Sequence, residues 1–128
     1  MSAATIAAAR ERIRHMHVVS VSDLPAGEGS RSRSLEGSEV GGVDLSIIFV
    51  DLDPGRGPRL HRHDYPEVFV VQEGRALYTA AEERRKVGPG DVVVVPAGVP
   101  HRFESTGDVP LRQLSLHLAP EMLTEWLA

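Results

Sequence analysis

The sequence contains no cysteine among its 128 residues, and aromatic side chains make up only 5% of it. The absence of cysteine excludes disulfides and thiolate chemistry. Positive charge is also scarce, because 14 Lys and Arg stand against 18 Asp and Glu, for a formal net charge of −4. Nucleic-acid binding depends on clustered Lys and Arg. This balance therefore argues against a nucleic-acid partner.

Long apolar runs are missing as well, so the sequence contains no candidate membrane span. Residues 1–10 lack the positive start and the strongly apolar centre of a secretory signal. We therefore predict a cytoplasmic protein with no membrane partner. The length suits one domain that is able to bury a core.

What the sequence does contain is a series of short strand patterns, separated by turns rich in its 12 glycines and 9 prolines. Strands are predicted near residues 43–52, 67–71, 76–79, 92–95 and 111–118. Little helix is expected beyond an Ala-rich N-terminal helical arm within residues 1–17 and a short helix that starts near Ala119. The fold class is therefore all-β, a sandwich or closed barrel over residues 18–128.

Three of these segments carry more specific expectations. The four valines of residues 92–95 predict a strand that is buried on both faces, and the charged residues 81–86 predict a solvated hairpin loop. Along residues 111–118, Leu114, Leu116 and Leu118 share one side. The other side is polar, with Gln113, Ser115 and His117. Alternation alone does not decide which side faces the interior.

Three histidines and one glutamate lie in two short blocks of the sequence. His61 and His63 are two residues apart and would face the same side of a strand. Glu67 opens the apolar run 68–71, and His101 follows the valine strand after a proline turn. Imidazole nitrogens with one carboxylate oxygen suit a divalent first-row metal such as Fe, Mn, Ni, Cu or Zn. We therefore predict a metal site with His61, His63, Glu67 and His101 as ligands.

Alternation places further side chains beside this predicted site. The predicted substrate pocket comprises Phe69, Val71, Tyr78, Phe103 and Gln113. Glu67 is expected either to remain a plain ligand or to detach and shuttle a proton. His117 is a candidate for supporting the metal centre or for acid–base chemistry, so Glu67 and His117 are the predicted catalytic residues. Arg31 and Arg33 share one side of a short strand, either as a solvated edge or as a clamp for an anionic substrate.

The two blocks resemble the two sequence motifs of the cupin superfamily. The first motif has a Gly, five residues, His-x-His, three or four residues, a Glu, six residues and a Gly; it is met by Gly55, His61, His63, Glu67 and Gly74. The second has a Gly, five residues, Pro-x-Gly, two residues, a His, three residues and an Asn; it is met by Gly90, Pro96, Gly98 and His101. The closing Asn position holds Ser105, which affects no predicted metal ligand.

This resemblance implies a small single-domain cupin, a jelly roll or double-stranded β-helix with one divalent transition-metal ion inside the barrel. It also implies a homodimer, as is common for family members of this size. Three histidines and one glutamate leave coordination positions open, as catalytic metal sites require. The expected function is a metal-dependent enzyme that acts on a small oxygenated organic substrate, of the dioxygenase, isomerase or cyclase type.

The alternative is a non-catalytic binding module. Cupins also occur as sugar- or metabolite-sensing domains, and the same pocket would then bind a small molecule without turnover. The sequence shows no helix-turn-helix pattern, which weighs against a transcriptional sensor. The apolar character of the predicted pocket favours a flat aromatic or polyketide-like ligand over a free sugar.

Overall fold

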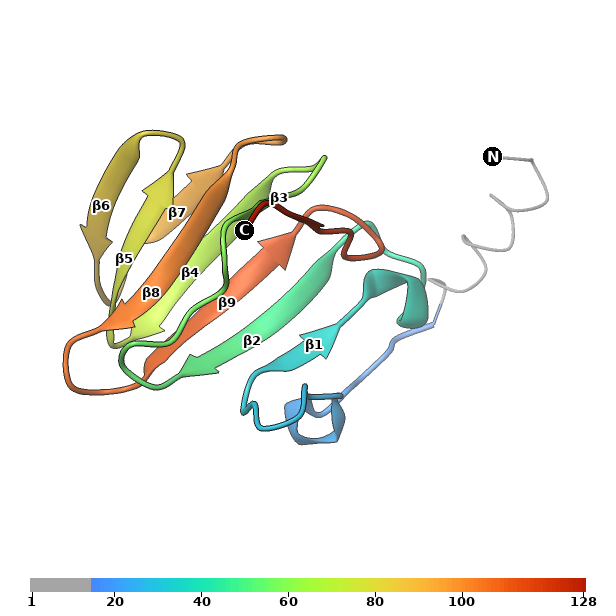
Figure 1. Ribbon diagram of the computed structural model, residues 1–128. Helices are drawn as coiled ribbons and strands as arrows, with labels where there is room; N and C mark the ends of the chain where they lie inside the picture. The colour runs from blue at the N-terminus through green and yellow to red at the C-terminus, as the bar shows by residue number, and fades with distance from the viewer. Residues whose placement is uncertain (1–14) are drawn as a thin grey trace.

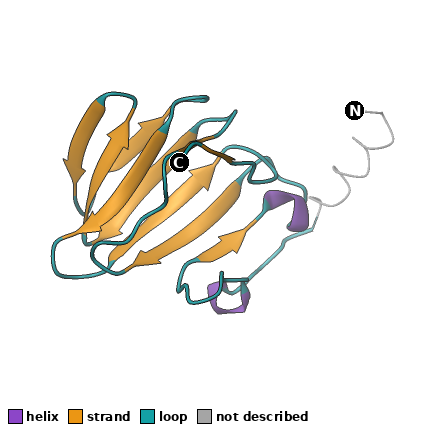
Figure 2. Cartoon of the chain, in the orientation of Figure 1, coloured by secondary structure: helices purple, strands orange, loops and turns teal. Residues whose placement is uncertain are grey.

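Two five-stranded antiparallel β-sheets form the body of the computed structural model, which describes residues 15–128 (Figures 1 and 2). The strands are β1 Arg33–Leu35, β2 Ser46–Leu52, β3 His61–Arg62, β4 Glu67–Glu73, β5 Arg75–Ala80, β6 Glu83–Val87, β7 Val92–Val95, β8 His101–Thr106, β9 Leu111–His117 and β10 Glu125–Trp126. Two short 3₁₀ turns, η1 Val21–Asp23 and η2 Gly37–Glu39, are the helical segments of the described residues. The first sheet has the order β1-β2-β9-β4-β7, and the second has the order β10-β3-β8-β5-β6. The predicted all-β jelly roll is confirmed.

Alternate residues of the two sheets meet in an apolar core between them. Phe69 of the first sheet is fully buried, and its ring centroid lies 5.1 Å from that of Tyr78 and 5.6 Å from that of Phe103 in the second sheet. Tyr78 and Phe103 stack on each other with centroids 5.1 Å apart. The same cluster includes Val50, Val71, Ala76, Val95 and Leu111. Large aromatic side chains therefore fill the interior where the two sheets face each other.

The polar side of β9 faces this interior. Gln113, Ser115 and His117 are buried, whereas Leu114 and Leu116 are half-buried on the outer face. The Tyr78 hydroxyl of the opposite sheet donates a hydrogen bond of 2.6 Å to Gln113 Oε1. A partner across the core therefore offsets part of the cost of burying the amide.

Two local expectations were wrong, and both concern strands at a sheet edge. Val92 and Val94 are 59% and 62% exposed, because their side chains lie on the outer face of the first sheet and only the inner side of β7 meets the core. Residues 83–87 form the edge strand β6 of the second sheet, and only Ala81 and Glu82 make the turn. The exposed charges of β6 suit an edge strand, since they discourage pairing with another chain.

The two ends of the chain were also predicted as helical. The short C-terminal helix expected from Ala119 is not formed, and the two-residue strand β10 follows an irregular segment instead. Tertiary contacts claim the backbone groups that a helix would need: Ser46 Oγ donates to the Ala119 carbonyl at 2.9 Å, and the Met122 amide donates to Glu36 Oε2 at 2.8 Å. The predicted N-terminal arm falls mainly on residues 1–14, outside the described residues, and residues 15–17 are not helical. In the described part of the chain, no helix has the length and apolar character needed to span a bilayer.

Candidate metal centre

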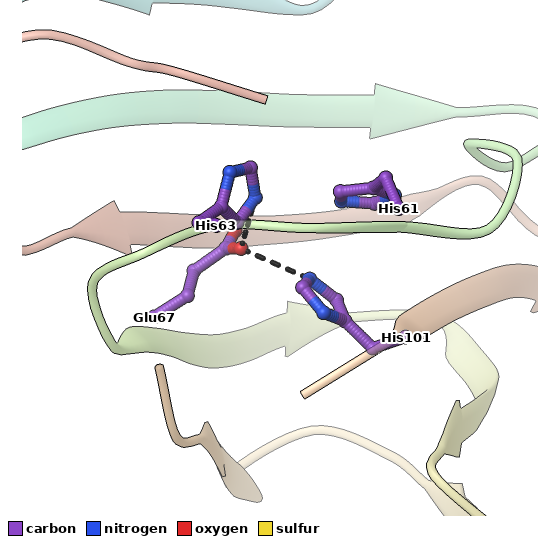
Figure 3. Close-up of side chains that lie close together, drawn as sticks. All are labelled: His61, His63, Glu67 and His101. Carbon is purple, nitrogen blue, oxygen red and sulfur yellow. Dashed lines mark hydrogen bonds and ion pairs between the residues drawn. The ribbon is translucent and has the colours of Figure 1, made fainter. Parts of the chain in front are cut away.

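The four predicted metal ligands lie together at one end of the barrel (Figure 3). β3 pairs with β8 so that His61 lies opposite His101, Glu67 begins β4, and His63 follows β3. Their ligand atoms all lie within 4.8 Å of one another. All four residues are buried, and His61 is the most exposed of them at 6%. The structure therefore gathers side chains that are up to 40 positions apart in the sequence.

Each of the three imidazoles is held by a backbone carbonyl. The Nδ1 atoms of His61, His63 and His101 lie 2.7, 2.8 and 2.9 Å from the carbonyl oxygens of Arg59, Leu123 and Val99, respectively. A carbonyl only accepts hydrogen bonds, so Nδ1 carries the proton and donates it in each ring. The lone pair is then on Nε2 of each ring, which is the usual arrangement of a metal-binding histidine.

The Glu67 carboxylate lies among these Nε2 atoms. Its Oε1 is 3.1 Å from His63 Nε2 and 3.2 Å from His101 Nε2, as the dashed lines in Figure 3 mark. Although His63 Nε2 is this close, the geometry is not that of a hydrogen bond, and the nitrogen has no other partner. A lone pair that faces a carboxylate oxygen in a buried site needs a proton or a metal cation between the two.

The electrostatics of the site agree with this requirement. Burial alone would raise the pKa of the Glu67 carboxyl, but contacts with His101, His117 and His63 outweigh burial and hold the pKa well below its usual range. Burial lowers the pKa of the His61 imidazole, despite its hydrogen bond to the Arg59 carbonyl. Burial also opposes protonation of His63, but its contacts with Glu67 and the Leu123 carbonyl raise its pKa overall. The site thus combines an ionised carboxylate with imidazoles that share either a proton or a metal ion.

This donor set fits a divalent first-row transition metal. Three imidazole nitrogens and one carboxylate oxygen are suited to Fe, Mn, Ni, Cu or Zn, and the set lacks the excess of oxygen ligands that Ca²⁺ and Mg²⁺ prefer. The unpartnered Nε2 of His63 and the fixed Nδ1 atoms are the observations that support the fit. His61, His63, Glu67 and His101 are the residues that would hold the ion.

His117 lies beside His63, with ring centroids 4.8 Å apart, and approaches the second carboxylate oxygen of Glu67. Its Nε2 lies 3.1 Å from Glu67 Oε2, off the line of a good hydrogen bond, and its Nδ1 lies 2.8 Å from the hydroxyl of buried Tyr65. The Leu123 amide donates to the same hydroxyl at 3.2 Å. The proton of His63 Nδ1 points to the Leu123 carbonyl, so the Tyr65 proton has His117 Nδ1 as its acceptor. Nε2 of His117 then carries a proton that faces the carboxylate.

The predicted substrate-pocket residues lie in the core beside the site. Among them, Phe69 lies with its ring centroid 6.1 Å from that of His101. Phe69, Val71, Tyr78 and Phe103 pack against one another, and Gln113 accepts from Tyr78. Their role as a pocket stays a prediction. Arg31 instead pairs with Asp51 and Asp53, and Arg33 donates to the Leu24 carbonyl, away from the metal centre.

Two contributors to the site were not identified from the sequence. Tyr65 is 8% exposed and links His63, His117 and Leu123. It is two residues from both His63 and Glu67, so alternation could have placed it on the same side as these ligands. Trp126, the single tryptophan, lies with its ring centroid 5.2 Å from that of His61. Sequence analysis placed Trp126 on a C-terminal helix that does not form. No nearby sequence pattern predicts its contact with His61.

Comparisons with known proteins agree with the fold. A sequence model of the family described as "Cupin domain" matches residues 48–117. An uncharacterized protein of Methanocaldococcus jannaschii is 34% identical over 80 residues, which cover 62% of this chain and 64% of that protein. Another, from Streptomyces coelicolor, is 37% identical over 78 residues, which cover 61% of this chain and 73% of that protein. The match to the archaeal protein thus spans less than two thirds of its length.

Solved structures with the same fold include enzymes and proteins without a stated activity. Oxalate decarboxylase from Bacillus subtilis aligns with a TM-score of 0.75 and 24% identity, over 88% of this chain and 33% of that chain. A Klebsiella pneumoniae protein with a double-stranded β-helix domain aligns with a TM-score of 0.68 and 18% identity, over 87% of this chain and 96% of that chain. At these identities the likeness concerns the fold alone, and this chain spans about a third of the decarboxylase. Because the family match covers more than half of the chain and includes all four clustered histidine and glutamate residues, this chain belongs to the cupin family.

Proposed function

We propose that this protein is a metal-dependent enzyme that binds one divalent transition-metal ion on His61, His63, Glu67 and His101. Its substrate would be a small oxygenated organic molecule, in a reaction of the dioxygenase, isomerase or cyclase type. The observation that carries the proposal is the convergence of buried Nε2 atoms on one carboxylate, with each Nδ1 held by a carbonyl. The solved neighbours named as oxalate decarboxylases, one described with Mn(II) centres, support a small oxygen-rich substrate and manganese as a first metal to test.

A bound ion of this kind polarises a carbonyl or enolate oxygen and stabilises the negative charge that develops there. The Glu67 carboxylate would balance part of the charge of the ion, and the carbonyl partners would keep the imidazole rings in place. Phe69 and Phe103 would exclude water from the inner side of the site, because they are at most 7% exposed. Since these rings fill the interior, the substrate would approach from the side of His63 and be small.

Metal analysis of the purified, tag-free protein tests this function. The wild-type protein is expected to retain close to one Mn or Fe per chain, and Glu67→Gln is expected to lose most of it. Glu73→Gln is the matched control, because Glu73 is an exposed residue of the same strand. Loaded protein would then be assayed for consumption of oxygen and of small carboxylic acids, enols and diketones. If the protein binds metal but turns over none of these substrates, the result would favour the non-catalytic binding module. Failure to bind metal even after reconstitution would overturn the proposal.

We propose that His117 positions Glu67 for this centre. The support is its placement between the Tyr65 hydroxyl and the second carboxylate oxygen. Loss of a group that orients a metal ligand typically weakens metal binding by about 10–100-fold. The metal affinity of His117→Leu is therefore expected to be lower than that of the wild type by a factor in this range. His117→Gln, whose amide can still donate to the carboxylate, should recover much of the loss. Competition with a coloured chelator measures both affinities, and wild-type affinity in the leucine variant would remove this role.

We also propose that the protein is a homodimer joined through the outer face of its first sheet. In the strand register of that sheet, apolar residues form two rows across four strands: Ile47, Leu116, Val68 and Val94, and then Phe49, Leu114, Val70 and Val92. An apolar face of this kind is typical of a protein–protein contact. Sedimentation velocity is expected to give a dimer for the wild type and a monomer for Val94→Lys, with Glu82→Lys as the control. A wild-type monomer would contradict this assembly.

A further inference from the structure

The C-terminal residues 123–127, called the strap below, lie over the metal centre. In Figure 1 this dark red end of the chain runs beside β3, the strand that carries His61. β10 pairs with β3 so that Trp126 lies opposite His61 and Glu125 lies opposite Arg62. The Leu127 amide donates to the Leu60 carbonyl at 3.0 Å, which extends the pairing by one residue. The strap thus adds an outermost strand to the second sheet at the end of the barrel that contains the ligands.

The strap contacts the candidate ligands directly. The Leu123 carbonyl accepts from His63 Nδ1 at 2.8 Å, and the Leu123 amide donates to the Tyr65 hydroxyl at 3.2 Å. The Trp126 ring lies against His61. With the strap in place, none of the four ligands is more than 6% exposed. With the strap closed, little of the surface of these ligands is therefore accessible to a metal ion or a substrate.

The strap itself is weakly held, in contrast to the segment before it. Leu123, Trp126 and Leu127 are 60%, 52% and 38% exposed, so the strap buries little apolar surface. Its side-chain contacts include the exposed Arg62–Glu125 ion pair, with N–O distances of 2.8 and 3.1 Å, and the Arg59 guanidinium 5.0 Å above the Trp126 ring. Two further contacts reach the candidate ligands: the Trp126 ring lies against His61, and Thr124 Oγ1 lies 3.5 Å from His63 Nδ1. Exposed contacts of this type contribute little stability, and segments with few buried contacts open at low cost.

The preceding segment is anchored to the body of the barrel. Ala119 and Met122 are bound by Ser46 and Glu36, and the Ser38 amide donates to the Pro120 carbonyl at 2.9 Å. The change from anchored to exposed backbone falls between Met122 and Leu123. A surface cavity of about 290 Å³ lies between the strap and Asp64 and Gly98, with His63 in its wall. Movement of the strap would widen this cavity toward the ligands.

We propose that the strap is a gate that lifts from β3, with Met122–Leu123 as its hinge, to admit the metal ion and a small substrate. This inference rests on the metal-dependent function proposed above. Lifting would also detach the Leu123 carbonyl from His63 and the Leu123 amide from Tyr65. The position of the gate therefore controls both access to the centre and the orientation of one of its ligands. The Arg62–Glu125 pair is the latch, because it is the ion pair that joins the strap to β3.

The single tryptophan makes the gate observable, since Trp126 is part of it. Arg62→Ala and Glu125→Ala are each expected to increase acrylamide quenching of Trp126 fluorescence in metal-free protein. They should also speed Mn(II) association and dissociation by up to about five-fold, the change in opening that corresponds to one exposed ion pair. The charge-swapped double variant Arg62→Glu/Glu125→Arg should return both quantities toward wild type.

Arg31→Ala is the matched control, because Arg31 forms an exposed ion pair with Asp53 away from the strap. It should leave quenching and metal exchange unchanged. Wild-type quenching and exchange in both single variants would overturn the gate, and failure of the swap to restore them would overturn the latch. The quenching comparison needs no metal, so it tests the gate even if the wild-type protein binds no metal, a result that would instead refute the proposed function.

Discussion

Replacing His101 by alanine is expected to weaken the binding of Mn(II) or Zn(II) by more than about 100-fold. Loss of a residue that only hydrogen-bonds to a metal ligand already weakens binding by up to about that factor. His101 is 1% exposed, its Nδ1 is fixed by the Val99 carbonyl, and its Nε2 lies 3.2 Å from Glu67 Oε1. The substitution removes one of four donors and also a partner of the buried carboxylate. The affinity is measured by chelator competition, with circular dichroism to verify that the variant is folded.

The control is a histidine outside the cluster. His15→Ala is expected to bind metal as the wild type does, because His15 is exposed and is not among the clustered side chains. His61→Ala should behave like His101→Ala, since the two residues lie opposite each other on β3 and β8. Equal metal content in His15→Ala and His101→Ala would mean that the site lies elsewhere.

Replacing Phe69 by alanine is expected to lower the free energy of unfolding by about 3–5 kcal/mol, the usual cost of deleting a buried aromatic ring. Phe69 is fully buried, and its ring meets Tyr78 and Phe103 from the opposite sheet. These rings belong to different strands, so the core cannot easily collapse into the space left behind. Urea denaturation should show a lower midpoint with an unchanged slope.

The same measurement tests whether the interior beside the metal centre is packed or open. Val109→Ala is the control, since Val109 is 52% exposed and its truncation should cost less than about 1 kcal/mol. A cost below about 1 kcal/mol for Phe69→Ala as well would mean that Phe69 borders an open space. That result would favour the substrate pocket predicted from the sequence over a solid core.

Local patterns were sufficient to predict the ligand cluster. Alternation placed His61 and His63 on the same side of a strand. The spacing to Glu67 and His101 depends on turns in which glycine is structurally required. Gly74 has a φ of +79°, and a Cβ there would collide with the Pro110 carbonyl. Such a position accepts glycine almost alone. The glycines of the two motifs therefore mark turns of the chain. These turns bring the candidate ligands to the same end of the barrel.

The sequence by itself indicated most of the strands and the four residues of the cluster, because alternation and turn residues are local signals. Their meeting in space depends on the pairing of β3 with β8, which joins residues 40 positions apart. The tertiary structure decided which face of each strand is buried, which depends on residues of other strands. Gln113 faces inward because Tyr78 of the opposite sheet donates to it, and His117 does so between Tyr65 and Glu67. The last residues form a strap and not a helix, because β3 and the buried His63 bind their backbone groups.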